Sequence, residues 1–109
     1  MNKKFDEIFE IADNLQWGII INDNEFNLQK YSQAGQDFNL HITANNTDEF
    51  ISELKSKYEN FDVSEETYLW LDNTGHGKNG APYDMKDVYE DMESCKEMML
   101  ELLNKIYIL

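Results

Sequence analysis

The excess of acidic side chains constrains the fold of this chain more than any other feature. The chain carries 22 Asp and Glu residues against 9 Lys and Arg, a formal net charge of −13 at pH 7. Because like charges repel each other in a compact domain, folding must leave almost all of them in water. The chain is nonetheless 41% hydrophobic and 13% aromatic, which is too apolar for a disordered acidic tail. The sequence therefore predicts a folded domain with an acidic surface.

A length of 109 residues predicts a single domain over residues 1–109, with one modest core. The single cysteine, Cys95, excludes an internal disulfide and a multi-cysteine zinc site, and it fits a reducing cytoplasm such as that of a host bacterium. No apolar run approaches the roughly 18 residues that span a bilayer, and no signal peptide is expected after the two N-terminal lysines. Nucleic acids and anionic membranes would be repelled, so neither is expected as a direct partner.

The first half of the chain predicts one helix and a small sheet. Apolar residues at helical spacing indicate a helix over about residues 2–15. Residues 17–22 and 26–31 indicate two strands around a turn at Asp23-Asn24. Residues 37–43 alternate strictly, with Phe38, Leu40 and Ile42 on one side. The short links between these strands predict a three-stranded antiparallel meander with one face in water.

The second half predicts three helices. Asn45–Thr47 indicate a cap for a helix over about residues 48–59, and Ser64 begins a short helix that runs through Leu71. After a loop over residues 72–83, the last helix runs from about Asp84 to Tyr107. The fold class is therefore α+β, with the three C-terminal helices packed on one sheet face. The last helix has an apolar seam with 3-4-3-4 spacing: Met85, Val88, Met92, Cys95, Met99, Leu102 and Ile106.

The last helix also carries a row of acids away from that seam. Glu90, Glu93, Glu97 and Glu101 recur at helical spacing, which places neighbouring side chains about 5–6 Å apart. Phosphates along a DNA strand have a comparable spacing, so the row could occupy a groove that normally holds nucleic acid. The simpler interpretation is a solvated helix face. The candidate partner-binding residues are Tyr83, Asp84, Asp87, Tyr89, Glu90, Asp91, Glu93, Glu97 and Glu101, with His76 and Lys78 of the loop.

The loop over residues 72–83 contains three of the five glycines and the only proline. It lacks the spacing and the Gly-Lys-Ser/Thr ending of a P-loop, so phosphate binding is not expected. Two interpretations stay open, a partner-binding loop shaped by its glycines and a plain connector. The only histidines, His41 and His76, do not form a metal-ligand pattern. No catalytic residue, metal or cofactor is predicted.

Two segments resemble small acidic proteins of phages and mobile elements in low-GC Gram-positive bacteria. They are Tyr31-Ser-Gln-Ala-Gly-Gln-Asp-Phe38 and Gly75-His-Gly-Lys-Asn-Gly-Ala-Pro-Tyr-Asp-Met85, and the likeness spans roughly residues 26–105. No catalytic motif accompanies that group. The resemblance implies an inhibitor of host defence of the anti-CRISPR or anti-restriction kind.

Three functions are therefore compared. The expected one is a non-enzymatic inhibitor that imitates nucleic acid and fills a basic groove of a defence nuclease, most naturally a type II CRISPR effector. The second is a protein-binding adaptor that uses the glycine-rich loop or a sheet edge, with acidity serving solubility alone. The third is an enzyme or small-ligand binder, which requires a pocket where His41 or His76 meets carboxylates. The sequence does not fix the oligomeric state.

Overall fold

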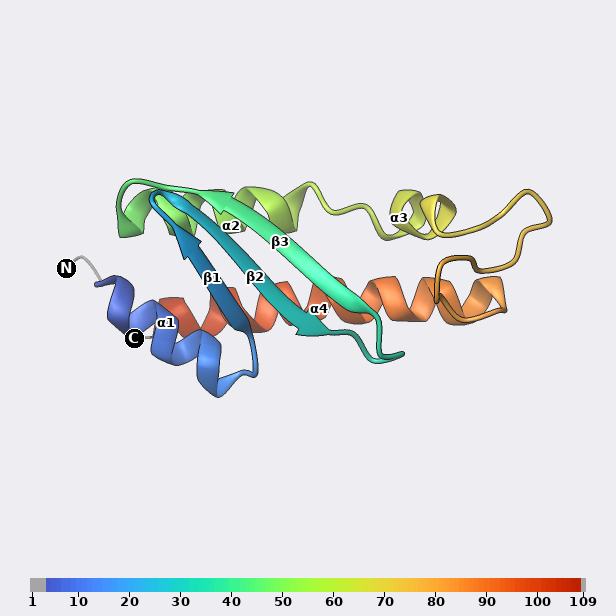
Figure 1. Ribbon diagram of the computed structural model, residues 1–109, viewed down its shortest axis with the longest axis horizontal. Coiled ribbons are helices and arrows are strands. Elements are labelled where there is room, and N and C mark those ends of the chain that lie inside the picture. The colour runs from blue at the N-terminus through green and yellow to red at the C-terminus, as the bar shows by residue number, and fades with distance from the viewer. Residues whose placement is uncertain (1–3, 109) are drawn as a thin grey trace.

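The computed structural model in Figure 1 describes residues 4–108 and confirms the expected α+β class. Residues 2 and 3, where the first helix was expected to begin, lie outside the described range. Seven elements follow in the predicted order: α1 (Phe5–Asn14), β1 (Gly18–Asn22), β2 (Glu25–Tyr31), β3 (Asp37–Thr43), α2 (Thr47–Glu59), α3 (Val63–Leu69) and α4 (Met85–Ile108).

Side-chain caps set the start of two helices. The Asn46 side chain accepts a hydrogen bond from the backbone N–H of Glu49 at 2.9 Å, as the cap of α2. Asp62 caps α3 by accepting from the backbone N–H groups of Ser64 and Glu65. The expected start at Ser64 was therefore one residue late, because the cap is the aspartate that precedes Val63.

The sheet is the predicted antiparallel meander, in the order β1-β2-β3. Leu28 pairs with Leu40, and Phe26 pairs with Ile42, so the apolar sets of β2 and β3 share one face. On the other face, Asn27 pairs with His41, and the Asn27 side-chain amide donates to Asn39 Oδ1 at 3.2 Å. The sheet thus has one buried face and one face in water, as the alternation of β3 predicted.

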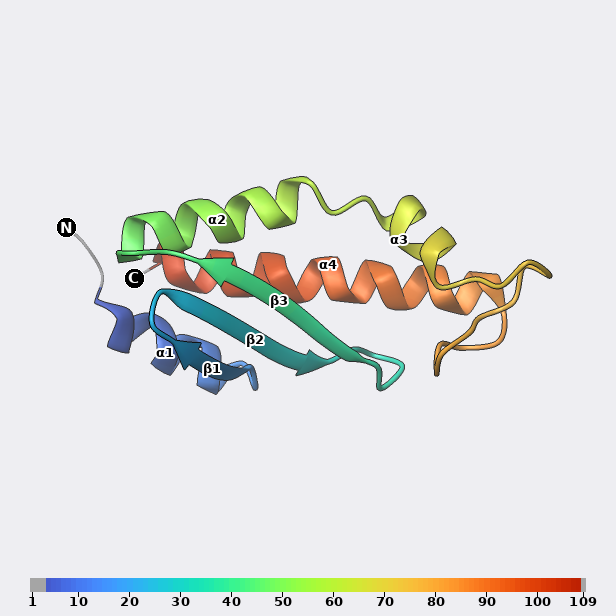
Figure 2. The same cartoon turned by 45° about the horizontal axis from the view of Figure 1, so that its top comes forward.

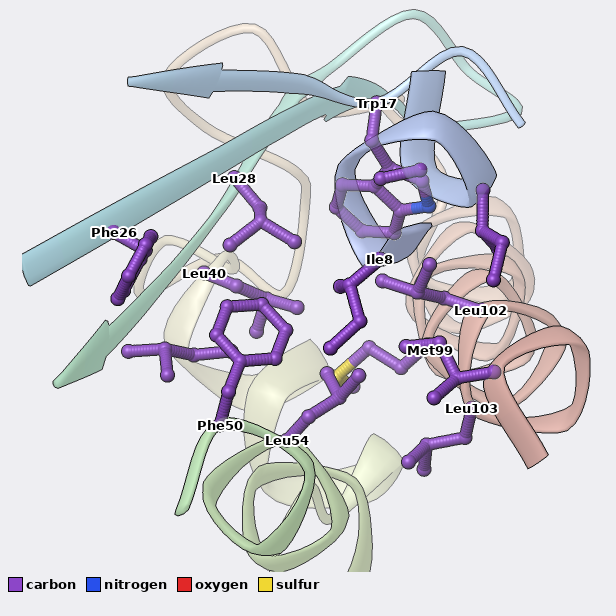
Figure 3. Close-up of a cluster of buried hydrophobic side chains, with 14 of the residues drawn as sticks. Ile8, Trp17, Phe26, Leu28, Leu40, Phe50, Leu54, Met99, Leu102 and Leu103 are labelled. Carbon is purple, nitrogen blue, oxygen red and sulfur yellow. The ribbon is translucent and has the colours of Figure 1, made fainter. Parts of the chain in front are cut away.

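Helices α1 and α2 and the C-terminal half of α4 cover the buried face of the sheet (Figures 1 and 3). Phe50 and Leu54 come from α2, and Ile8 from α1. Aromatic rings pack against one another in this core, where Phe26 meets Phe50 edge to face at a centroid distance of 5.3 Å. The remaining core residues are Ile11, Ala12, Trp17, Leu28, Leu40, Ile42, Ala44, Met99, Leu102, Leu103 and Ile106.

The shortest helix, α3, packs against α4 and lies beyond the end of the sheet, as Figure 2 shows. The expectation that all three C-terminal helices lie on the sheet face therefore fits α2 and α4, whereas α3 extends the molecule. The reason is length. The 24 residues of α4 span about 36 Å at 1.5 Å per residue, whereas a strand of seven residues spans about 24 Å. The overall extents of 50 × 25 × 21 Å reflect this overhang.

The apolar seam of α4 is buried from Val88 to Ile106, but its first member is not. Met85 was expected in the seam and is 57% exposed, because the first turn of α4 projects past the sheet. Val88, Met92 and Cys95 are buried in the overhanging part of the molecule, where α3 packs against α4. Leu103, which the seam did not include, completes the main core.

Candidate functional site

Four glutamates form a continuous row on the solvent side of α4. Glu90, Glu93, Glu97 and Glu101 are all exposed, and at 100° per residue they fall within a sector of about 80°. The buried seam lies on the opposite side of the helix. This row is called the acidic stripe below, and its placement is the one that the spacing predicted.

Lysines form ion pairs with the two end members of the acidic stripe but not with its two central members. Lys86 Nζ is 3.8 Å from Glu90 Oε1, and Lys30 Nζ is 3.9 Å from Glu101 Oε1. Among residues 4–108, no ion pair involves Glu93 or Glu97. The two carboxylates at the centre of the stripe therefore have no direct lysine contact among the described residues.

The side chain of Lys96, which precedes Glu97 in α4, contacts α2 and the segment after it. Its Nζ donates to the backbone carbonyl of Phe61 at 2.7 Å and lies 5.1 Å from the ring centroid of Tyr58. These contacts tie α4 to the last turn of α2 and to the segment that joins α2 and α3. Lys96 also lines a pocket with Glu93 and Glu97, so its positive charge lies beside the centre of the stripe although it forms no ion pair there in the described part of the chain.

Acids also occur on α1, α2 and α3, so negative charge is not confined to α4. The solvent face of the sheet differs, because its central positions carry uncharged polar side chains such as Asn27, Gln29 and Asn39. Acids on this face occupy the strand ends at Glu25 and Asp37. The distinguishing property of α4 is therefore alignment of its charges rather than their number.

Asp91 was expected among the exposed acids, and this expectation is wrong. The residue is only 2% exposed. Its Oδ2 accepts a hydrogen bond from the Ser32 hydroxyl at 2.8 Å, and its Oδ1 accepts from the backbone N–H of Ala34 at 2.7 Å. The nearby Ser94 hydroxyl accepts from the Gln33 N–H at 3.3 Å. Asp91 therefore fastens the β2–β3 turn to α4 and is not available to a partner.

The loop over residues 72–83 is ordered by hydrogen bonds within the loop itself. Asp72 Oδ1 accepts from the backbone N–H of Thr74 at 2.8 Å and from the Thr74 hydroxyl at 2.6 Å. These hydrogen bonds lower the pKa of Asp72, with the Thr74 hydroxyl as the largest cause. Leu71 and Gly77 form an isolated β-bridge, so the segment closes on itself. Whether it contacts a partner stays a prediction.

The other candidate residues of this end are exposed to different degrees. The His76 ring stacks on Tyr83 with a centroid distance of 4.1 Å, and His76 is half-buried in this way. Lys78, Asp84 and Asp87 are exposed. Tyr83 is exposed, and Tyr89 less so. The structure thus brings Tyr89 beside the first members of the acidic stripe, while His76 and Tyr83 sit in the loop.

A groove between α3 and α4 combines three of the candidate residues, Tyr89, Glu90 and Glu93, with residues that the sequence did not connect to a site. Its volume is about 580 Å³, and its floor is mainly apolar. Tyr68 of α3 is 79% exposed, and Tyr89 of α4 is 40% exposed. The lining residues are Ser64, Thr67, Tyr68, Leu71, Met85, Lys86, Tyr89, Glu90 and Glu93. The signal that could have revealed it is Met85, which continues the apolar seam past the end of the sheet.

A pocket that brings a histidine beside carboxylates, as the third function requires, lies at the edge of β3. His41 borders a cavity of about 420 Å³ between β3 and α2, together with Glu53, Lys57 and Glu66. Burial, followed by repulsion from neighbouring acids, raises the pKa of Glu66. The imidazole of His41 is instead 3.6 Å from Glu25, on the solvent face of the sheet. Within residues 4–108, no three His, Cys, Asp or Glu side chains converge in a manner that could hold a metal ion.

No helix in the described part of the chain is both long and apolar enough to cross a membrane. Comparison with protein-family models, with curated proteins and with solved structures finds no match to this chain. A proposed function must therefore rest on the geometry of α4 and its surroundings.

Proposed function

We propose that the protein binds a cationic groove of a nucleic-acid-binding protein through the acidic stripe of α4, and that it acts as a non-enzymatic inhibitor of a bacterial defence nuclease. The resemblance implies a host-defence target, and we choose a type II CRISPR effector as the specific one to test. The single observation that carries the proposal is the row of four exposed glutamates on one helix face. The row lies opposite the core, so a partner can reach it without any change in the fold.

The two central glutamates supply most of the expected attraction. Glu93 and Glu97 have no ion pair among the described residues, whereas Glu90 and Glu101 each have a lysine within 4.0 Å. Complementary charge speeds association and selects partners more than it strengthens the final complex. Because the Debye length is about 8 Å at physiological ionic strength, exposed contacts of this kind weaken as salt is added. Inhibition should therefore fall as the salt concentration rises.

The experiment measures DNA cleavage by purified type II effectors, with guide RNA loaded, at increasing concentrations of the protein. The double variant Glu93→Lys/Glu97→Lys should abolish inhibition. The matched control is Asp6→Lys/Glu10→Lys on α1, which changes the net charge by the same amount at two exposed residues four positions apart. This control should retain most of the inhibition.

Equal loss in both double variants would show that total charge matters and that the stripe does not. If the wild-type protein inhibits no effector, the assignment to these nucleases is wrong. A pull-down from a host lysate at low and high salt then identifies the cationic partner, or shows that none binds through charge.

The sheet edge supports a second candidate, the protein-binding adaptor. β1 pairs only with β2 within the described sheet, and it exposes two large apolar side chains, Ile20 and Ile21. An exposed edge strand can accept a further strand from a partner. Ile20→Lys should abolish binding if this edge is the contact and leave it unchanged if the acidic stripe is.

A further inference from the structure

The α3–α4 groove points to a second element of recognition beside the acidic stripe. Three of its side chains are apolar or aromatic: Tyr68 and Met85 are more than half exposed, and Tyr89 is 40% exposed. Its volume of about 580 Å³ falls within the usual range for binding clefts, roughly 300–1,000 Å³. A contact made by charges alone would leave this apolar surface in water, so we infer a partner that covers it with apolar side chains.

Charge limits what can occupy the groove. Glu90 and Glu93 belong to both the groove and the acidic stripe, so an occupant lies against carboxylates on one side. Lys86 is the one basic residue that lines the groove, and it already lies 3.8 Å from Glu90. A second copy of this chain would bring another net charge of −13 to the same surface and be repelled. Nucleic acids and anionic lipid surfaces are repelled for the same reason.

Backbone geometry favours a helical occupant. Most of the groove is lined by two helices, whose backbone groups pair within the helix, and Leu71 beyond α3 already pairs with Gly77 in a β-bridge. The groove therefore offers no strand edge to which an extended peptide could add hydrogen bonds. An amphipathic helix pairs its own backbone groups and presents apolar side chains at positions i, i+3, i+4 and i+7.

We propose that the α3–α4 groove receives an amphipathic helix of the partner protein, with apolar side chains in the groove and lysine or arginine toward Glu90 and Glu93. This inference rests on the proposed function in one respect, namely that the partner is cationic. It adds that the contact has an apolar anchor, so part of the affinity persists at high salt. Tyr89 is the central residue, because it lies one position before Glu90 and lines the groove.

Two synthetic helical peptides of 18 residues test the inference. Both contain the same leucines and lysines; one has its leucines on a single helix face, and the other has a scrambled order. Binding to the full chain is measured by fluorescence anisotropy, and the contact is located by amide chemical-shift changes. We expect the patterned peptide to bind at least tenfold more tightly and to shift residues of α3 and the first turns of α4.

Variants separate the groove from the stripe. Met85→Ser/Tyr89→Ser should weaken the patterned peptide at least tenfold and leave the scrambled peptide unchanged. Both side chains are exposed, so the fold should persist. Tyr107→Ser, at an exposed tyrosine near the other end of α4, is the matched control and should change neither peptide. Glu97→Lys/Glu101→Lys should weaken both peptides equally, which tests the charge contact alone.

Equal binding of the two peptides, or shifts confined to other elements, would overturn the groove proposal while leaving the acidic stripe in place. If the glutamate variant changes neither peptide, the proposed function itself fails. The remaining possible occupant is a second copy of this chain, and sedimentation of the protein without peptide shows whether it dimerises. A dimer that Met85→Ser/Tyr89→Ser disperses would show that a second copy fills the groove, and this too would overturn the inference.

Discussion

The Ser32 hydroxyl donates a 2.8 Å hydrogen bond to the carboxylate of Asp91, a residue 59 positions away in the chain. The other oxygen of this carboxylate accepts from the backbone N–H of Ala34 at 2.7 Å. One buried acid thereby fastens the tip of the β2–β3 hairpin to the first third of α4. Because Glu90 of the acidic stripe lines one pocket with Asp91 and Ala34, this bond also fixes how the start of the stripe lies relative to the sheet.

Replacing Asp91 with alanine should lower the free energy of unfolding by about 3 kcal/mol, because two hydrogen bonds to a charged acceptor are lost and the Ser32 hydroxyl stays buried. Urea unfolding followed by circular dichroism measures the change. Asp87→Ala, at an exposed acid of the same helix, should change stability by less than about 0.5 kcal/mol. A similar effect in both variants would contradict the role assigned to Asp91.

Gly77→Ala should destabilise the α3–α4 end. A Cβ at this position would lie 1.8 Å from the backbone carbonyl oxygen of Pro82, so the loop backbone must move. We expect a loss of about 1–3 kcal/mol, as for overpacking at other tightly packed sites. Gly80→Ala is a useful comparison, because no atom lies within 4 Å of the added Cβ, although the φ of +87° strains alanine there. A stability equal to wild type for Gly77→Ala would show that residues 77 and 82 can separate freely.

The Cys95 thiol should be unreactive in the folded protein. It is 1% exposed, and burial, followed by repulsion from Asp91, raises its pKa from 9.0 to about 12. Alkylation by iodoacetamide at pH 8.5 should be at least about a hundredfold slower than in denaturant, because the thiolate forms only on opening. Rapid labelling under native conditions would contradict this burial.

The same shift predicts how stability depends on pH. Above pH 9 the unfolded chain loses the thiol proton that the folded chain keeps, so the unfolded state binds fewer protons. The stabilisation from the neutral thiol is complete below pH 9, and it is lost as the pH rises toward about 12. Unfolding curves of the wild type and of Cys95→Ala should therefore converge over this range. A constant difference between them would show that the thiol does not titrate this way.

Glu97→Lys should stabilise the protein rather than weaken it. Glu93 and Glu101 lie four residues to either side, so the substitution replaces two repulsions with two attractions. We expect a gain of about 0.5–1 kcal/mol at low salt, with little gain at 1 M salt because the charges are then screened. Thermal unfolding at both ionic strengths provides the measurement. A loss of stability would mean that the stripe serves the fold and would remove the reason to assign it a partner.

Local patterns were sufficient for the elements themselves. The alternation of residues 37–43 indicated which side of β3 is buried, because side chains in a strand alternate between faces. The repeat from Val88 to Ile106 likewise indicated the buried side of α4 and hence placed Glu93 and Glu97 in water. These assignments depend on backbone geometry over a few residues, which the sequence encodes directly.

Contacts between segments that are distant in the chain could not be predicted from the sequence, and the reason is also physical. In the sequence, Asp91 looks like any other surface acid. Its burial is favourable only because the β2–β3 turn packs against it and donates a hydroxyl and a backbone N–H to its carboxylate. Met85 continues an apolar repeat, yet it stays exposed because the sheet ends before the helix does. Local spacing thus determined the helices, the strands and the row of glutamates. Tertiary packing alone decided which acid is buried and where an apolar groove is left open, because both depend on where the neighbouring elements end.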